Sequence, residues 1–322
     1  MSESVRQDLP DAYTAQRGVR MSSMNRREFV QLSAAAVAGS SLLGSTRIVR
    51  AAEPPIRLKK AVKLSMVRVE GASMDERFQL MKDCGFEGCE IDSPGTDADQ
   101  AIASAKKAGI RIHGVIDSVH WNKRFSSPTA ETREEAHAAL KTAIAACKTV
   151  GGTTVLVVPA SLRKEKDGST DGTYQEAWDR SIAEIKRGIP LAKEAGVKIA
   201  IETVWNEFIT TPKQFVEYID AFNDPTVGGY FDISNMLKYG VSSADWIRQT
   251  GKRLLKVDCK GYNTDSQAWV EIGLGSENWP EVLQALKDVN YPGEFLTAEV
   301  RGGGRERLLE VSRQMDKVLQ LT

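Results

Sequence analysis

Residues 198–202 read Lys-Ile-Ala-Ile-Glu, a short apolar run that ends in a carboxylate. Three later runs have the same form, and they are GGYFD (228–232), LLKVD (254–258) and EFLTAE (294–299). Each run has the length and apolar character of a buried parallel strand. In an α/β barrel the C-terminal ends of the strands open onto the active-site face. We therefore predict a functional site at the four terminal residues Glu202, Asp232, Asp258 and Glu299.

Four carboxylates that converge on one point repel one another unless a cation lies between them. Oxygen ligands of this kind favour hard divalent cations such as Mg²⁺ and Mn²⁺. The pattern therefore predicts a divalent metal in the mouth of a barrel, bound by these four side chains.

The rest of the chain alternates apolar runs with amphipathic stretches. The predicted strands are 61–67, 88–91, 111–115, 154–158, 198–201, 229–231, 254–257 and 295–298. The predicted helices are 75–83, 97–108, 131–150, 174–195, 212–221, 244–250, 279–289 and 306–319. Alternating strands and helices imply a parallel sheet, and eight such units imply a single (β/α)₈ TIM barrel. An open, doubly wound sheet is the alternative, although no GxGxxG motif follows the first strand.

The first 51 residues do not fit this pattern. Arg26 and Arg27 precede a modestly apolar stretch at 32–43, and small residues follow around Ala51. This layout is typical of a twin-arginine signal peptide, so we expect export to the periplasm, with the barrel in residues 52–322. A disordered tail with a chance arginine pair is the alternative. The apolar stretch is shorter than the roughly 20 residues that a membrane span needs.

Composition excludes several partners. The chain has 43 basic and 43 acidic residues and no basic run with interleaved aromatic residues, so we expect neither nucleic acid nor a membrane surface as a partner. The four cysteines show no CxxC spacing, which disfavours a zinc knuckle. Cys84 and Cys89 are either buried free thiols or a disulfide.

Several segments resemble the xylose isomerase-like TIM-barrel superfamily of sugar (phosphate) isomerases and epimerases, and in particular its branch with twin-arginine signals. The resemblance spans about residues 60–320, and its most specific segments are IETVWN (201–206), YFDISN (230–235), KVDCK (256–260), TAE (297–299) and GFEGCE (85–90). It implies a divalent ion, Mn²⁺, Mg²⁺ or Co²⁺, on Glu202, Asp232, Asp258 and Glu299. Asp258 stands where the family usually has histidine. Asn235 stands where many members of the family also have histidine.

The same resemblance implies a metal-dependent sugar isomerase or epimerase. Such an enzyme moves a proton beside a carbonyl through a metal-stabilised enediolate, with Glu202 and Glu299 as the acid/base pair. The expected substrate-binding residues are Glu90, His120, Trp121, Asn206, Asn235, Lys260 and Arg301. His113 is either a site residue or a hydrogen-bonded residue of the barrel. The partner is a small sugar, and a homo-oligomer is in keeping with the family.

Three alternatives remain at this stage. A lyase or dehydratase acting on a keto-sugar would use the same site, because the enolised intermediate is shared. The missing histidine at position 258 keeps open a non-catalytic, sugar-binding barrel. A zinc endonuclease needs several histidine ligands, and the chain has three histidines, none at a clear ligand position.

Overall fold

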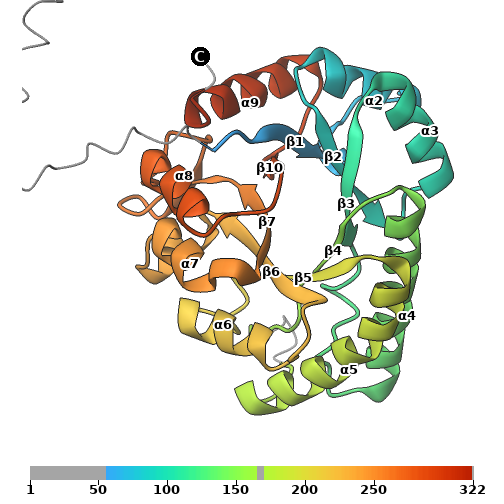
Figure 1. Ribbon diagram of the computed structural model, residues 1–322, viewed down its shortest axis with the longest axis vertical. Helices are drawn as coiled ribbons and strands as arrows, with labels where there is room; N and C mark the ends of the chain where they lie inside the picture. The colour runs from blue at the N-terminus through green and yellow to red at the C-terminus, as the bar shows by residue number, and fades with distance from the viewer. Residues whose placement is uncertain (1–55, 165–169, 321–322) are drawn as a thin grey trace, which may run out of the picture. The chain divides into compact units, whose positions relative to one another are not determined.

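The computed structural model describes residues 56–164 and 170–320, all within one compact unit, Pro54–Thr322. Eight parallel strands close into a barrel in the order β1-β10-β7-β6-β5-β4-β3-β2, and the helices surround it (Figure 1). The prediction of a single (β/α)₈ TIM barrel is confirmed. The predicted export segment, residues 1–51, lies outside the described residues.

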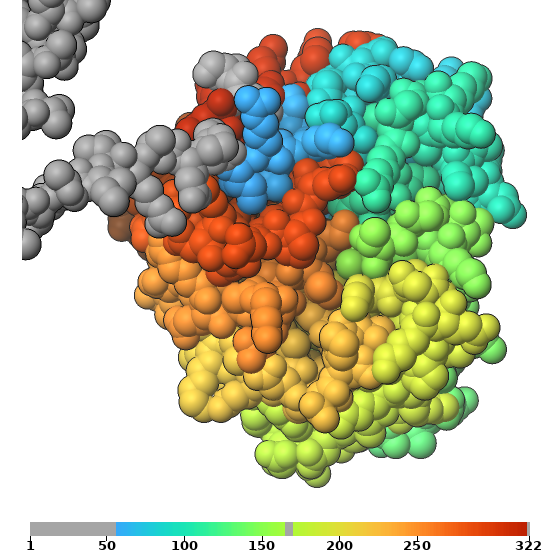
Figure 2. Space-filling view, viewed as in Figure 1, coloured from blue at the N-terminus to red at the C-terminus, as the bar shows by residue number. Residues whose placement is uncertain are grey.

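The barrel strands are β1 Lys59–Lys63, β2 Gly88–Ser93, β3 Arg111–Asp117, β4 Thr154–Val157, β5 Lys198–Glu202, β6 Val227–Ile233, β7 Leu254–Cys259 and β10 Phe295–Ala298. The ring closes where β1 pairs with β10, with Lys59 opposite Phe295. The two ends of the described chain therefore lie side by side, which Figure 2 shows as the blue and red surfaces in contact.

The helices around the barrel are α2 Met74–Asp83, α3 Ala98–Ala108, α4 Ala130–Thr149, α5 Tyr174–Ala195, α6 Pro212–Asp220, α7 Ser243–Thr250, α8 Trp279–Asp288 and α9 Arg305–Val318. Capping boxes at Ser73, Thr173 and Thr211 begin α2, α5 and α6. Gly196 ends α5 in the left-handed conformation that glycine adopts at low cost. None of the described helices is long and apolar enough to cross a membrane.

The predicted strand boundaries lie within two residues of the observed ones, except at the end of the first strand. The first strand ends at Lys63, and the chain then turns into the 3-10 helix η1, Leu64–Met66. Strand β6 begins at Val227, two residues earlier than predicted, and so includes Gly228 as well as the predicted Gly229. A Cβ atom on Gly229 would lie 2.7 Å from the Phe215 ring, so the glycine lets α6 pack closely against the sheet.

A small hairpin follows β7 and was not predicted. It pairs β8, Gly261–Asn263, with β9, Ala268–Val270. The Asn263 side chain accepts hydrogen bonds from the backbone of Asp265 and Ser266 and so closes the turn. Two further short 3-10 helices are η2, Asn235–Tyr239, and η3, Gly251–Arg253. Strands of three residues carry too little periodicity to be seen in the sequence.

The main apolar core fills the space between sheet and helices, and the barrel interior is partly polar. A small apolar cluster of Ile116, Leu156, Ala200 and Tyr230 lies apart from that core. Buried ionisable residues also lie on the strands, namely Lys63, Glu90, His113, Lys256 and Asp258. Branched apolar side chains usually fill this space, so the polar groups indicate a functional requirement. Cys84 and Cys89 are both free and buried, which excludes the disulfide alternative.

Candidate functional site

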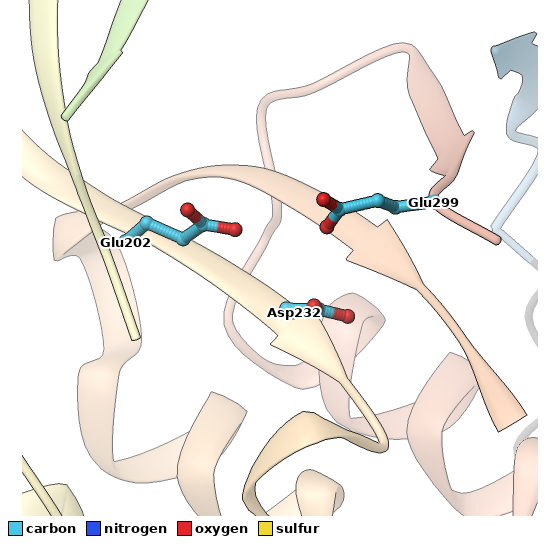
Figure 3. A group of neighbouring side chains, drawn as sticks. All are labelled: Glu202, Asp232 and Glu299. Atoms are coloured by element: carbon cyan, nitrogen blue, oxygen red, sulfur yellow. The ribbon is translucent and has the colours of Figure 1, made fainter. Parts of the chain in front are cut away.

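Three of the four predicted carboxylates meet at the C-terminal mouth of the barrel. Glu202 ends β5, Asp232 lies near the end of β6 and Glu299 follows β10. One carboxylate oxygen from each lies within 4.8 Å of the others. Figure 3 shows the side chains of Glu202 and Glu299 extending toward each other, with Asp232 beside them. The structure thus brings together Glu202, Asp232 and Glu299.

Two lysines stand among these carboxylates. The Lys260 ammonium, just after β7, lies 2.6 Å from Asp232 Oδ2 and 2.9 Å from Glu299 Oε2. The Lys63 ammonium, at the end of β1, lies 3.1 Å from the same Glu299 oxygen. The two cations therefore compensate part of the buried negative charge. Lys260 was predicted in the site, whereas Lys63 was missed.

Asp258 is directed toward other partners. One of its oxygens accepts a hydrogen bond from the Tyr230 hydroxyl, and the other lies 2.7 Å from the Lys63 ammonium. Asp258 does not belong to the three-carboxylate group. Its role as a metal ligand therefore stays a prediction. Its contacts in the structure position Lys63 and Tyr230.

Glu90 lies deeper in the barrel than expected. Its Oε2 lies 2.7 Å from the Tyr230 hydroxyl oxygen, and its Oε1 lies 3.6 Å from His113 Nδ1. The same His113 nitrogen lies 3.0 Å from the Lys256 ammonium. Burial raises the pKa of Glu90 to about 7. The structure therefore places Glu90 and His113 in an interior network below the site, with no contact to the cavity described below.

The space for the Glu90 carboxylate depends on Gly114 of β3. A Cβ atom there would lie 2.5 Å from Glu90 Oε1 and 3.2 Å from Thr154 Oγ1. Gly114→Ala should therefore lower the free energy of unfolding by about 1–3 kcal/mol, as overpacking of a filled interior does. Urea unfolding would measure this loss.

The matched control for Gly114→Ala is the same substitution in a Glu90→Ala background. If contact with Glu90 is the cause, the loss in that background should be clearly smaller. An equal loss in both backgrounds would show that the Glu90 carboxylate is not what Gly114 accommodates.

The three clustered carboxylates differ in their affinity for a proton. Burial raises the pKa of Glu202 well above its usual range and that of Asp232 to about 7. Burial acts in the same direction on Glu299, but the charges of Lys63 and Lys260 outweigh it and hold the pKa of Glu299 below its usual range. Burial thus favours the protonated form of Glu202, and the two lysines favour the ionised form of Glu299.

A cavity of about 340 Å³ opens above the carboxylates, a size that suits a small ligand. Four of the predicted substrate-binding residues line it together with Glu202 and Glu299, and they are His120, Trp121, Asn235 and Lys260. It is also lined by Lys63, Ser65, Asp92, Ile116, Ser118, Leu156, Arg163, Val204, Trp205 and Trp269. A second cavity of about 350 Å³ lies at the opposite mouth of the barrel, away from the face where TIM-barrel active sites form.

Besides Glu90, two more of the predicted substrate-binding residues, Arg301 and Asn206, lie outside this cavity. Arg301 lines a neighbouring cavity. Asn206 uses its side chain within the protein, since Nδ2 donates to the Ala160 carbonyl at 2.6 Å and Oδ1 accepts from the Phe208 amide. Asn206 therefore stabilises the loops beside the cavity and does not line it.

The histidine and tryptophans of the cavity have distinct surroundings. His120 is buried, which lowers its pKa to about 3 and keeps the ring neutral. Trp121 packs edge-on against it. On the other side the Trp205 and Trp269 rings stack at a centroid distance of 4.5 Å. Aromatic faces of this kind are suited to the apolar faces of sugar rings.

The site residues that were not predicted from the sequence occupy positions in the strand pattern that could have indicated them. Lys63 ends an apolar strand, as the four carboxylates do. Tyr230 lies two residues before Asp232 and therefore points to the same face of β6. The role of Trp269 depends on the β8–β9 hairpin, which the sequence pattern does not reveal.

Comparison with known proteins gives consistent relatives. The proposed L-ribulose-5-phosphate 3-epimerase SgbU of Haemophilus influenzae is 24% identical over 268 residues, which cover 76% of this chain and 90% of that protein. The crystal structure of the 3-keto-D-glucoside 4-epimerase YcjR from E. coli superposes with a TM-score of 0.69, at 16% identity, over 82% of this chain and all of that one. The IolI protein with a bound zinc atom gives a TM-score of 0.67, at 17% identity, over 82% of this chain and 99% of that one.

The family model described as xylose isomerase-like TIM barrel matches residues 78–318. This match spans most of the barrel, from α2 to α9, and includes the three clustered carboxylates. The chain therefore belongs to the xylose isomerase-like TIM barrel family.

Proposed function

We propose that this protein is a metal-dependent sugar isomerase or epimerase that moves a proton on the carbon beside a carbonyl group. The observation that carries the proposal is the group of Glu202, Asp232 and Glu299 at the C-terminal mouth of the barrel, within 4.8 Å of one another. The names of SgbU and YcjR, both epimerases of sugars, support the same class of reaction.

The residues present fit a divalent cation. All three clustered groups offer carboxylate oxygens, the donors that Mg²⁺ and Mn²⁺ prefer. Asp232 Oδ1 is buried and has no hydrogen-bond partner among the described residues. The Lys260 ammonium already stands between Asp232 and Glu299, which shows that a positive charge is accommodated there. Glu202, Asp232 and Glu299 would hold the ion, with Asp258 as the fourth predicted ligand.

A bound divalent ion supplies charge stabilisation for the oxygen atoms of an enediolate. The protein's own groups would do the rest. Glu299, held ionised by Lys63 and Lys260, would take the proton from one face of the reacting carbon. Glu202, whose pKa burial raises, would return a proton from the other face. His120 and Trp121 would position the sugar from the third loop.

Two further properties belong to the same proposal. The paired residues Arg26 and Arg27 and the apolar stretch after them support export by the twin-arginine pathway. Export would place the reaction in the periplasm. A homo-oligomer is expected, because members of this family often form one.

Metal content tests the proposal. Residues 52–322, incubated with Mn²⁺ and desalted, should retain about one equivalent by elemental analysis, because the three carboxylates form one site. Glu202→Ala should lose the ion. The control is Glu294→Ala, an exposed glutamate at the opposite end of β10 that pairs with Arg111. Absence of retained metal, or equal retention in the Glu202→Ala protein, would contradict the metal site.

A further inference from the structure

We propose that the substrate is a glycoside: a sugar that reacts above Glu202 and Glu299 and carries a second sugar unit in an adjoining cavity. This inference rests on the proposed function and specifies its substrate class. The adjoining cavity has a volume of about 810 Å³ and shares Lys260, Trp269 and Glu299 with the cavity over the carboxylates. The two cavities therefore border each other at these three side chains.

The sizes of the two cavities favour a substrate of two units. The inner cavity, at about 340 Å³, is near the lower end of the range for small-ligand sites, which runs from roughly 300 to 1,000 Å³. A free monosaccharide would use this space alone. The outer cavity adds more than twice that volume on the open side, and a second unit joined through a glycosidic bond would occupy it.

Trp269 at the junction is held in place. Its ring stacks on Trp205 at 4.5 Å and packs against Tyr262 at 5.4 Å. The hairpin that carries it is tightly built, since a Cβ atom on Gly261 would lie 2.3 Å from the Glu271 carbonyl oxygen. Even so, 48% of Trp269 is exposed. Trp205 covers one face of the ring and the Lys260 ammonium lies over the ring at 5.6 Å from its centroid, so the exposed part of the indole is the surface offered to a sugar ring.

Part of the wall of the outer cavity is apolar. Val270, Leu274 and Val300 line it beside Trp269, and Leu274 is 71% exposed. An exposed leucine on the wall of a cavity offers apolar surface to a ligand. This apolar part of the wall is suited to the apolar face of a sugar unit.

The charged side chains of the outer cavity largely compensate one another. Arg307 is neutralised there, with Glu271 at 2.8 Å and Glu310 at 2.7 Å, and it also donates to the Arg301 carbonyl. Glu271 is paired with Arg307 and Glu299 with Lys260, so these two carboxylates are compensated as well. Arg301 lines the cavity and can donate to the hydroxyl groups of a second sugar.

Binding measurements on the Mn²⁺-treated chain test the inference. The probes are D-fructose, three disaccharides that carry a second sugar on fructose (isomaltulose, lactulose and turanose) and fructose 6-phosphate. Isomaltulose and fructose 6-phosphate are substituted at the same oxygen, one with a neutral sugar and one with an anion. We expect at least one disaccharide to bind about tenfold more tightly than fructose, a gain equivalent to ~1.4 kcal/mol.

The Leu274→Ser variant tests whether the tighter binding of a disaccharide arises in the outer cavity. Leu274 lines the outer cavity and not the inner one, so the variant should lose most of the disaccharide advantage and bind fructose as before. No advantage for any disaccharide, or an advantage unchanged by Leu274→Ser, would overturn the inference. A preference for fructose 6-phosphate that Arg301→Ala removes would also overturn it and assign the cavity to phosphate. Metal retention is measured separately, so failure of the subsite is distinguishable from failure of the proposed function.

Discussion

Replacement of Glu299 by glutamine should lower the rate of proton exchange by about 10²–10⁴-fold, the contribution of a positioned general base. Glutamine keeps the shape of the side chain but cannot take a proton from carbon. In the wild-type chain Lys63 and Lys260 hold Glu299 ionised, which makes it the group prepared to act as the base. The measurement is deuterium incorporation from D₂O beside the carbonyl of a sugar that the wild-type chain exchanges, followed by NMR.

Glu294→Gln is the matched control for Glu299→Gln. Glu294 immediately precedes β10, Glu299 immediately follows it, and Glu294 is exposed and pairs with Arg111. The control should exchange protons at the wild-type rate. Metal content measured on both variants separates loss of the base from loss of a ligand. Exchange at the wild-type rate in Glu299→Gln would remove Glu299 from the acid/base pair.

The fold was predictable because barrel strands are locally encoded. The run at 154–158 is almost entirely apolar and β-branched, and β4 occupies Thr154–Val157. The helix predicted at 174–195 is present with the same bounds, since Thr173 caps its start and Gly196 its end. Caps and hydrophobic runs are local signals, so they need no knowledge of the tertiary contacts.

The site was predictable where it depends on topology and not where it depends on side-chain pairing. Parallel strands place their C-terminal ends at one mouth, and this alone brings Glu202, Asp232 and Glu299 together. The partner of each carboxylate is a tertiary property. Asp258 pairs with Lys63 from a strand almost two hundred positions earlier in the chain, and no local pattern indicates that contact.

Lys63 and Lys260 compensate part of the negative charge that the sequence pattern assigned to a metal ion. Four carboxylates alone would demand a cation, whereas Lys63 and Lys260 supply two positive charges inside the group. A divalent ion would then complete the compensation and need not provide all of it. The stability of the barrel mouth should therefore depend on Lys63 even when no metal is bound.

Lys63→Met should lower the free energy of unfolding by roughly 3–5 kcal/mol in chelator-containing buffer, the cost of leaving a buried charge without its partner. Lys63 is nearly buried, with 7% of its side chain exposed, and Asp258 beside it is fully buried. Methionine fills similar volume, so the loss reports the charge and not a cavity. Urea unfolding of the two proteins gives the difference.

The pH dependence reports the carboxylates that lose Lys63, chiefly Asp258, because Glu299 keeps Lys260 as a partner. Burial already raises the pKa of Asp258, and the charge of Lys63 opposes that rise. Without Lys63 the pKa of Asp258 in the folded state rises further. A carboxyl group whose pKa is higher in the folded than in the unfolded state lowers the free energy of unfolding as the pH increases through that folded-state pKa. The cost of Lys63→Met should therefore be larger at pH 8 than at pH 5. Lys59→Met, at the exposed start of the same strand, should cost about 0.5 kcal/mol or less at both pH values. A loss for Lys63→Met that is small, or the same at both pH values, would show that the Asp258 charge does not depend on Lys63.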